Sequence, residues 1–418
     1  MTWQTETIAV PEPTDAPASD DPTRMGFRRW MDHVSRSFLQ GRTSDGQFDD
    51  WIAVAHADGH VVRQVIDGDA IVGTFCDYPW RVSLGAGTIP FWAITDVGVA
   101  PTHRRRGMLR DMMTDSLQRA VDAGMPMAAL TVSEGSIYGR FGFGVAGPLW
   151  RVELTARDVE LRQSVPGGVR FIEPSDLEPH LEDLFETTRT TWPGIHPMTQ
   201  HRHAVLGRYD WDADKVPTDR YAAVHENDAG VVDAALVWKY TKDGREDVGT
   251  VLLVECLWGA PSGIWSLLEF CANVDLIDVI VLPGAPPVDQ LRAVLKNPRA
   301  VSVKRQSDGM WFRPLDIAAC VAARPWGADG EVTIRITDPL GHAEGTWRIR
   351  VQDGRGSAER VTDDVSAMTI TVDTFASLLG DARFADLALA GRVQNVADVA
   401  QVDRILGAAP TPWHNVGF

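Results

Sequence analysis

The sequence predicts an α+β protein of mixed helices and strands that is divided into several domains. The chain has 418 residues, which is long for a single hydrophobic core. A strand, an Ala-Pro step and an amphipathic helix occur near residue 100, and the same order returns near residue 260. From about residue 310 the sequence pattern changes and predicts alternating strands and short helices. These observations predict two related domains over 22–160 and 161–309 and a different one over 310–418.

The composition limits the classes of function. A formal net charge of −17 argues against a nucleic-acid-binding protein, which needs a basic face. The same charge suits a protein that attracts small cationic molecules, and simple solubility explains it equally well. The hydrophobic fraction of 44% is ordinary for a soluble globular protein.

The N-terminus and the cysteines indicate the environment of the protein. Residues 1–21 are rich in acids and prolines and predict a flexible acidic tail, with no signal peptide. No apolar stretch is long enough to span a membrane, so we expect a cytoplasmic protein, or one exported without a recognisable signal. Cys76, Cys256, Cys271 and Cys320 have no metal-binding spacing. We expect reduced core thiols and no metal.

The first domain begins with a clear helix signal. Asp21-Pro22 provides a cap and a first-turn proline, and large apolar residues follow at helical spacing. We expect strands over 51–59, 61–66, 71–84 and 91–100, a helix over 109–123, a strand over 127–132, a glycine-rich turn and a strand over 149–154.

The second domain repeats part of this order. We expect a helix over 173–192, strands over 219–226, 231–240 and 250–260, a helix over 261–275 and a strand over 277–282. Its Ala-Pro step is followed by Ser262-Gly263-Ile264-Trp265, where the first domain has arginines. The repeat predicts one working copy and one structural copy, with chance similarity as the competing explanation.

The last domain has its own pattern. A helix is expected over 315–324, strands over 331–339, 346–354 and 366–373, and helices from 374 and over 396–409. The final residues, TPWHNVGF, are apolar and aromatic, which predicts that they are buried rather than dangling in solvent.

The arginine run of DVGVAPTHRRRGMLR predicts an anion site. Backbone N–H groups at a helix N-terminus favour negative charge, and arginine adds forked donors that suit phosphate oxygens. The alternative is that the three arginines are simply exposed to solvent and bind nothing. A dinucleotide-binding GxGxxG motif and a phosphate-binding GxxxxGK[ST] motif are both absent. The position between a strand ending in Ala-Pro and an amphipathic helix favours the anion site.

VGVAPTHRRRGML resembles the acetyl-CoA loop of the GCN5-related N-acetyltransferases (GNAT), whose R/Q-x-x-G-x-G/A run wraps a pyrophosphate. Leu109 departs from the final Gly/Ala of that run. With SEGSIYGRFGFG and a terminal phenylalanine, the chain resembles the enhanced intracellular survival (Eis) family. The resemblance implies two tandem GNAT-like domains, the second degenerate, and a C-terminal domain of the sterol-carrier-protein type.

The resemblance also implies how the co-substrate, acetyl-CoA, is held. Backbone groups of the strand would lie along the pantetheine, the arginine loop would take the pyrophosphate, and a serine after the next strand would add a contact. The positions that match this pattern are Val97, Gly98, Val99, Arg104, Arg105, Gly107 and Ser133. Among the strand amides, the N–H of Val99 is the leading candidate to stabilise the oxyanion.

The resemblance and elementary chemistry together suggest the proton carriers. Tyr138 is the expected general acid, because a phenol stays protonated at neutral pH and can donate to a thiolate. Two candidates remain for the base: the terminal carboxylate of Phe418, and Asp96, which alternates in phase with Gly98. Phe38 and Trp51 are expected to line the acceptor pocket, whereas His103 is interpreted as a loop residue.

The expected activity is transfer of acetyl to amines of cationic acceptors such as aminoglycosides or lysine side chains, by a homo-hexamer. Two alternatives stay open. One is a lipid or small-molecule carrier that uses the sterol-carrier-like domain. The other is a protein-lysine acetyltransferase with a regulatory role, which shares the chemistry and differs only in its acceptor.

Overall fold

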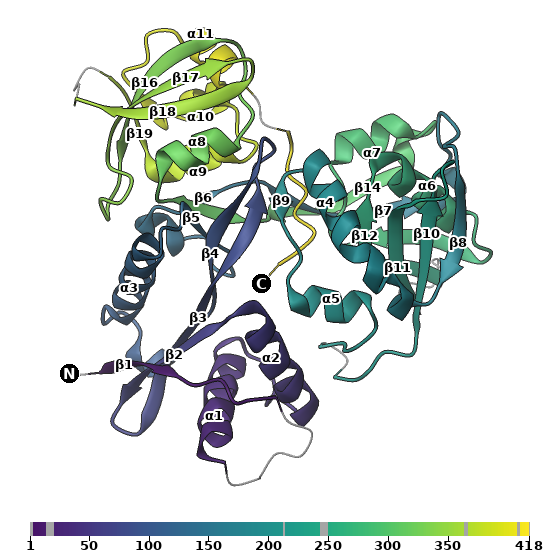
Figure 1. The fold of residues 1–418 in the computed structure, drawn as a ribbon, viewed down its shortest axis with the longest axis horizontal. Coiled ribbons are helices and arrows are strands. Elements are labelled where there is room, and N and C mark those ends of the chain that lie inside the picture. Colours follow the sequence, from purple (N-terminus) through teal and green to yellow (C-terminus); the bar gives the residue numbers. More distant parts are fainter. Residues whose placement is uncertain are drawn as a thin grey trace.

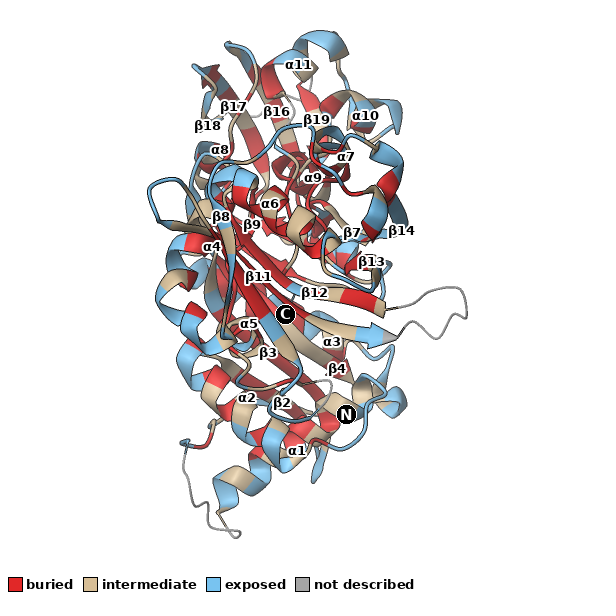
Figure 2. Cartoon of the chain, turned by 90° about the vertical axis from the view of Figure 1, so that its right-hand side faces the viewer, coloured by how far each residue is buried: buried red, intermediate tan, exposed pale blue. Residues whose placement is uncertain are grey.

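The structure is a computed structural model that describes residues 3–13, 21–211, 214–242, 250–362, 367–407 and 410–417. Three β-sheets, each with its own helices, form three domains (Figure 1). The first two correspond to the related domains that the sequence predicts, and the third to the C-terminal domain with a different pattern. Most strand residues at the centres of the sheets are buried (Figure 2).

The first sheet has the order β1-β2-β3-β4-β5-β15-β6, and β9 pairs with β3. Helices α1 and α2 pack with Cys76 and Tyr78 of β3, whereas α3 packs with Phe75 on the opposite face. Its elements are β1 (Gln4–Ile8), α1 (Pro22–Ser37), α2 (Asp45–Asp58), β2 (Val61–Asp67), β3 (Ala70–Ser83), β4 (Thr88–Val99), η1 (Pro101–His103), α3 (Met108–Asp122), β5 (Met127–Leu130), η2 (Tyr138–Phe141), β6 (Gly144–Val145), β9 (Gly194–Ile195) and β15 (Trp311–Pro314).

The second sheet has the order β14-β7-β13-β12-β11-β10-β8, with α4 and α6 packed against its central strands. Its elements are β7 (Pro148–Thr155), η3 (Ala156–Asp158), β8 (Gly168–Ile172), η4 (Pro174–His180), α4 (Leu181–Thr191), α5 (Thr199–Val205), β10 (Arg220–Glu226), β11 (Val232–Lys242), β12 (Thr250–Gly259), α6 (Pro261–Ala272), β13 (Ile277–Leu282), α7 (Val288–Val294), η5 (Pro298–Ala300) and β14 (Val301–Asp308).

The third sheet has the order β18-β17-β16-β19-β20. Its buried side chains join the core of the first domain, so these two domains share one hydrophobic cluster. Its elements are α8 (Ile317–Ala323), β16 (Gly330–Thr337), β17 (Gly345–Gln352), β18 (Arg355–Val361), β19 (Met368–Thr371), α9 (Val372–Leu379), α10 (Phe384–Leu389), β20 (Val393–Gln394) and α11 (Val399–Leu406).

The first two domains exchange a strand each. β7 follows β6 in the chain but lies between β13 and β14, and β15 follows β14 but lies between β5 and β6. The domain boundaries predicted at 160 and 310 therefore misplace these two strands, and they also place β9, which pairs with β3 of the first sheet, in the second domain. The prediction assigned each strand to the domain of its neighbours in the sequence. Burial decides otherwise, because Leu154 of β7 is buried in the core of the second domain and Phe312 of β15 in that of the first. The reciprocal exchange also supports the internal repeat.

Two local predictions are wrong. Residues 51–59, predicted as a strand, belong to α2, which begins with a capping box of Ser44 and Gln47 and ends at Gly59 in the left-handed region. Part of the expected flexible acidic tail is the edge strand β1, which pairs with β2. The rest of that tail lies mostly outside the described residues.

The last described residues, 411–417, here called the tail, run between the first and second domains (Figure 1). Trp413, His414 and Val416 are buried, as the aromatic composition of the segment predicted. Phe418 lies outside the described residues. The four cysteines are free and buried, also as predicted.

Candidate active site

The site begins where β4 and β5 separate. These parallel neighbours pair only at Trp92–Ala128 and Ala93–Ala129. Beyond this point the strands diverge and leave a cavity of about 200 Å³, here called the cleft. Its lining comes from the two strand ends and η2: Phe38, Ile94, Thr95, Asp96, Val97, Leu130, Thr131, Val132, Ser133 and Tyr138. Backbone groups that no strand partner can reach are thereby available to a ligand.

The end of β4 is bent by a bulge at Asp96. The register with β3 shifts between Cys76–Thr95 and Thr74–Gly98, and Asp96 has a φ of 54°. Such a φ is strained for a non-glycine residue and is common at functional sites. The simple alternation by which we aligned Asp96 with Gly98 is therefore interrupted. Asp96 nevertheless reaches the acceptor side, because it lines both the cleft and a second cavity.

The electrostatics of Asp96 suit a base. Burial raises the pKa of its carboxyl to about 7. In the part of the chain that the structure describes, no hydrogen bond or ion pair of this carboxylate offsets the burial, although its backbone carbonyl accepts from Thr74 Oγ1 at 3.1 Å. A general base works best with a pKa near the working pH.

The amides beyond the bulge point to alternate sides of β4. The N–H of Ala100 donates to the carbonyl of Val72 on β3 at 2.9 Å. Because successive N–H groups of a strand point to opposite sides, the N–H of Val99 points away from β3. Val97 lines the cleft, whereas Gly98 and Val99 lie outside its lining, so the role suggested for Val99 stays a prediction.

The arginine loop is exposed and precedes α3, as predicted. Arg104, Arg105 and Arg106 follow the short η1, and Gly107 precedes the first residue of α3 with a φ of 93° and no side-chain cap. The first-turn N–H groups of this 15-residue helix are thus left for a ligand. His103 hydrogen-bonds to its neighbour Thr102 and to Asp67 at the end of β2. It lines neither the cleft nor the second cavity.

Tyr138 and Ser133 lie across the cleft from β4. Tyr138 is buried on η2, packs against Phe143, and has a raised pKa because of burial and then the nearby charge of Glu134. It therefore stays protonated and can donate a proton. Arg313 Nε donates to the carbonyl of Phe141 at 2.6 Å, and Arg313 is ion-paired with Asp338 at 2.7 Å. The third domain thus fixes the end of η2.

The second cavity, of about 170 Å³, is here called the acceptor cavity. Trp51 lines it, whereas Phe38 lines the cleft on the other side of Asp96. Several lining residues escaped the sequence reasoning because they come from distant segments and carry no motif: Asp58, His60, Tyr78, Met198, Gln200 and Trp211.

Burial also shapes the polar groups of the acceptor cavity. It raises the pKa of Asp58, against the opposing effect of hydrogen bonds from Thr199. It lowers the pKa of His60 to about 3, so this ring is neutral where it stacks on Tyr78. The cavity therefore presents aromatic faces and two carboxyls, a combination that suits an ammonium group.

A third cavity lies next to the acceptor cavity. It has a volume of about 440 Å³, belongs mainly to the second domain, and shares Gln200 and Trp211 with the acceptor cavity. Its carboxylates Asp210 and Glu255 are already paired with Arg220 and Lys239. Asp96, by contrast, lines both the cleft and the acceptor cavity, and no side chain in the described ranges forms an ion pair with it.

Comparison with known proteins supports the domain assignment. Residues 21–146 and 201–314 each match a family model described as an acetyltransferase (GNAT) domain, and residues 317–415 match a sterol carrier protein domain. The gap between the first two matches contains the exchanged strand β7. None of the helices in the described ranges is long and apolar enough to cross a membrane.

Relatives match along most of the chain. An uncharacterized N-acetyltransferase of Streptomyces avermitilis is 29% identical over 83% of this chain and 86% of its own length. The N-acetyltransferase Eis of Mycobacterium tuberculosis is 28% identical over 82% of this chain and 85% of its own. The crystal structure of Eis1 from Mycobacterium abscessus superposes over all of both chains, with a TM-score of 0.79 at 22% identity.

Proposed function

Since the chain belongs to the Eis family and is an acetyl-CoA-dependent N-acetyltransferase with two GNAT domains and a sterol carrier protein domain, we propose that it acetylates a primary amine of a small cationic acceptor. One observation carries this proposal. Asp96, a carboxylate with a pKa of about 7, lies between the cleft and the acceptor cavity.

The proposed reaction assigns one role to each side of the cleft. Asp96 takes a proton from the acceptor ammonium, and the neutral amine attacks the thioester carbonyl of acetyl-CoA. The N–H of Val99 stabilises the oxyanion as the C–N bond forms. Tyr138 donates its proton to the departing thiolate as the C–S bond breaks, and the surplus proton on the new amide nitrogen returns to the Tyr138 phenolate. The proton taken up by Asp96 is released to solvent, which completes the cycle.

The co-substrate would be held by the two features that the first domain combines. Val97 and Ser133 line the cleft from the ends of β4 and β5, and Gly98 and Val99 continue the edge of β4 beyond it. Arg104, Arg105 and the N-terminus of α3 after Gly107 would take the pyrophosphate.

The acceptor is proposed to be a polyamine-like cation, such as an aminoglycoside, and a lysine side chain is the second candidate. The acceptor cavity of about 170 Å³ holds one amine-bearing group. The neighbouring cavity of about 440 Å³ gives the remainder of a larger molecule a place to extend, since Gln200 and Trp211 border both. This extension favours the larger acceptor.

The terminal carboxylate of Phe418 is the rival base. A chain extended by a few residues beyond Phe418 separates the two possibilities, because it displaces the carboxylate and leaves Asp96 unchanged. Retained turnover supports Asp96, and loss of turnover supports Phe418. The hexameric assembly and cytoplasmic location remain proposals, and light scattering tests the first.

The activity itself is tested by mixing protein, acetyl-CoA and a panel of amines and following free thiol release. The panel contains an aminoglycoside, a lysine peptide and an acetylated aminoglycoside as a matched acceptor without the amine. We expect thiol release with the aminoglycoside, which Asp96→Asn removes. Thiol release that is equal with and without a free amine would contradict the proposal.

A further inference from the structure

The second domain has a strand opening equivalent to the cleft. β12 and β13 run parallel and pair from Thr250–Ile277 to Leu253–Val281. Beyond Leu253 the paired register ends, as it does beyond Ala93 in the first domain. In both domains this opening is a cavity, and in the second Asn415 of the tail forms part of its wall beside the ends of β12 and β13.

Hydrogen bonds hold the tail on both sides of this opening. Trp413 donates from its indole to the carbonyl of Gly284, just after β13, at 2.9 Å. Its backbone N–H donates to the carbonyl of Pro193 at 2.9 Å. Asn415 donates to the carbonyl of Leu257 on β12 at 3.5 Å. The tail is thus bonded to both strand ends.

Arg189 on α4 makes the strongest polar contacts with the tail. Its guanidinium donates to the Trp413 carbonyl at 2.8 Å and to Asn415 Oδ1 at 2.7 Å. The side chain is about 1% exposed and lies over the Trp258 ring at 4.9 Å. No carboxylate within the described ranges pairs with it, so the tail and the ring offset the cost of burying this cation.

Glycines make room for the tail. A Cβ at Gly284 would lie 3.0 Å from the Asn415 Cα, and one at Gly309 would lie 2.9 Å from the His414 ring. Neither glycine has a positive φ, so close packing against the tail, and not backbone conformation, is the constraint. Side chains at these positions would push the tail out.

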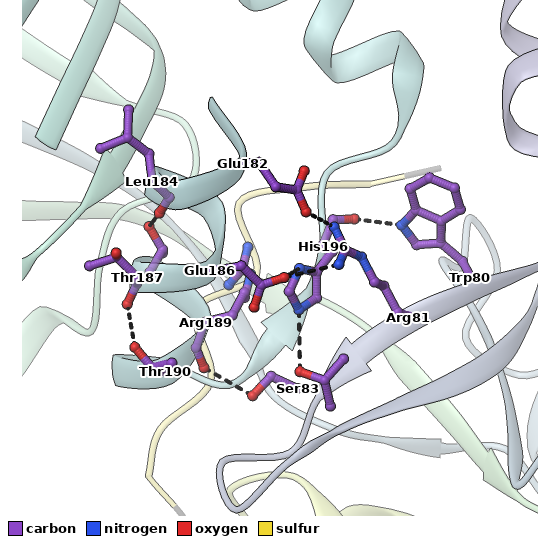
Figure 3. A network of polar contacts seen from close by, with 12 residues as sticks. Trp80, Arg81, Ser83, Glu182, Leu184, Glu186, Thr187, Arg189, Thr190 and His196 are labelled. Carbon is purple, nitrogen blue, oxygen red and sulfur yellow. Dashed lines mark hydrogen bonds and ion pairs between the residues drawn. The ribbon is translucent and has the colours of Figure 1, made fainter. Parts of the chain in front are cut away.

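The other end of α4 is fastened to the first domain. Arg81 on β3 pairs with Glu182 and Glu186, and Ser83 Oγ donates to the backbone carbonyl of Arg189 at 2.9 Å (Figure 3). Arg189 therefore connects β3 with the tail. At the far end of the tail, a Cβ on Gly417 would lie 4.0 Å from Thr131, which lines the cleft.

We propose that the ends of β12 and β13 form a peptide-binding groove for the chain's own tail along the rim of this cavity, and that Arg189 positions the tail at the mouth of the cleft. The degenerate domain would thus use its strand ends to hold a chain segment. The catalytic consequence rests on the proposed function, because the tail reaches the cleft where acceptor and thioester meet.

Hydrogen exchange of the full-length protein tests the groove without reference to activity. The amides of 411–417 are followed by mass spectrometry in the wild type, Arg189→Met and Asn415→Ala. Arg81→Met is the matched control, because it removes two ion pairs from α4 and leaves the tail contacts in place. We expect exchange in the tail to rise at least tenfold in both test variants and to stay unchanged in the control.

Steady-state kinetics then test whether Arg189 positions the tail for catalysis. We expect kcat/KM for the amine to fall about tenfold in Arg189→Met, with partial recovery in Arg189→Lys and an acetyl-CoA Kd within twofold of the wild type. Tail exchange that stays slow in both test variants overturns the groove. Faster tail exchange with an unchanged kcat/KM overturns the positioning role. Absence of transfer in the wild type would instead refute the proposed function, while the exchange result still decides the groove.

Discussion

The two acetyltransferase domains open the same pair of strands for different purposes. When the Ala-Pro steps at 100–101 and 260–261 are aligned, Cys256 stands where the first domain has Asp96. α3 begins seven residues after Pro101, following the arginine loop, whereas α6 begins at Pro261 itself. The first opening has the proposed anion site and the proposed base, whereas the second has the start of α6 and Cys256 at these places.

Under the proposed function, a strand opening alone does not make an active site. The opening frees backbone groups in both domains, but only the first adds charged donors for a pyrophosphate and a carboxyl with a pKa near neutrality. In the second domain the carbonyls of Leu257 and Gly284 bond to the tail at the rim of the opening. The predictions below test each element of this contrast, from the largest expected effect to the smallest.

Replacing the base should cause the largest loss. We expect Asp96→Asn to lower kcat by about 10²- to 10⁴-fold, the usual contribution of general acid–base catalysis. In the wild type, kcat/KM should rise with pH through about 7, because the carboxyl must be ionised to accept a proton. Steady-state kinetics across pH measure both, with the exposed Asp289→Asn as control. A profile that is flat through pH 7 would remove Asp96 from the base role.

Removing the general acid should have a smaller effect. Tyr138→Phe should lower kcat about 10- to 100-fold and leave the acetyl-CoA KM nearly unchanged, because water can still protonate the thiolate. Thiol-release kinetics measure this, with Tyr221→Phe in the second domain as the matched change. Full turnover of Tyr138→Phe would exclude the phenol from the mechanism.

Removing one arginine from the proposed anion site should weaken acetyl-CoA binding. Arg105→Ala should raise the acetyl-CoA KM about tenfold, equivalent to about 1.4 kcal/mol, with little change in kcat. The KM should also rise with salt, since these side chains are exposed. Arg305→Ala on β14 is the control for loss of an exposed arginine. If both variants behave alike, the loop does not hold the pyrophosphate.

The buried Asp96 carboxylate should also lower the free energy of unfolding at high pH. The folded-state pKa of Asp96 is raised from 3.8 to about 7, so its contribution to stability is lost as pH rises between these values. Asp96→Asn should therefore stabilise the protein at pH 8 by on the order of 2–4 kcal/mol relative to the wild type, and less at pH 4. Denaturant unfolding at the two pH values measures it. An equal change at both would show that ionisation is not the cause.

Much of the fold followed from the sequence because its signals are local. The helix after the arginine loop, the repeated strand and helix after Ala-Pro, and the buried aromatic tail all rest on neighbouring residues. The exchange of β7 and β15 did not follow, since sheet membership depends on which core buries Leu154 and Phe312. The helix α2 was mistaken for a strand although Ser44 and Gln47 form its capping box.

The residues of the candidate site also divide into those that the sequence predicted and those that it did not. The loop arginines and Tyr138 carried motifs, whereas Asp58, His60 and Trp211 reach the acceptor cavity from separate segments. The bulge that turns Asp96 between two cavities is a property of strand register, which the sequence pattern does not contain. Arg189 had no sequence signal at all, because its partners lie more than 220 residues away.

The most direct test of the contrast is the stoichiometry of acetyl-CoA binding, measured by titration calorimetry on the full-length protein. The account predicts one molecule per chain in the wild type and in Arg189→Met. It predicts no measurable binding when Arg104, Arg105 and Arg106 are all changed to Ala. Two molecules per chain, or undiminished binding in the triple variant, would contradict it.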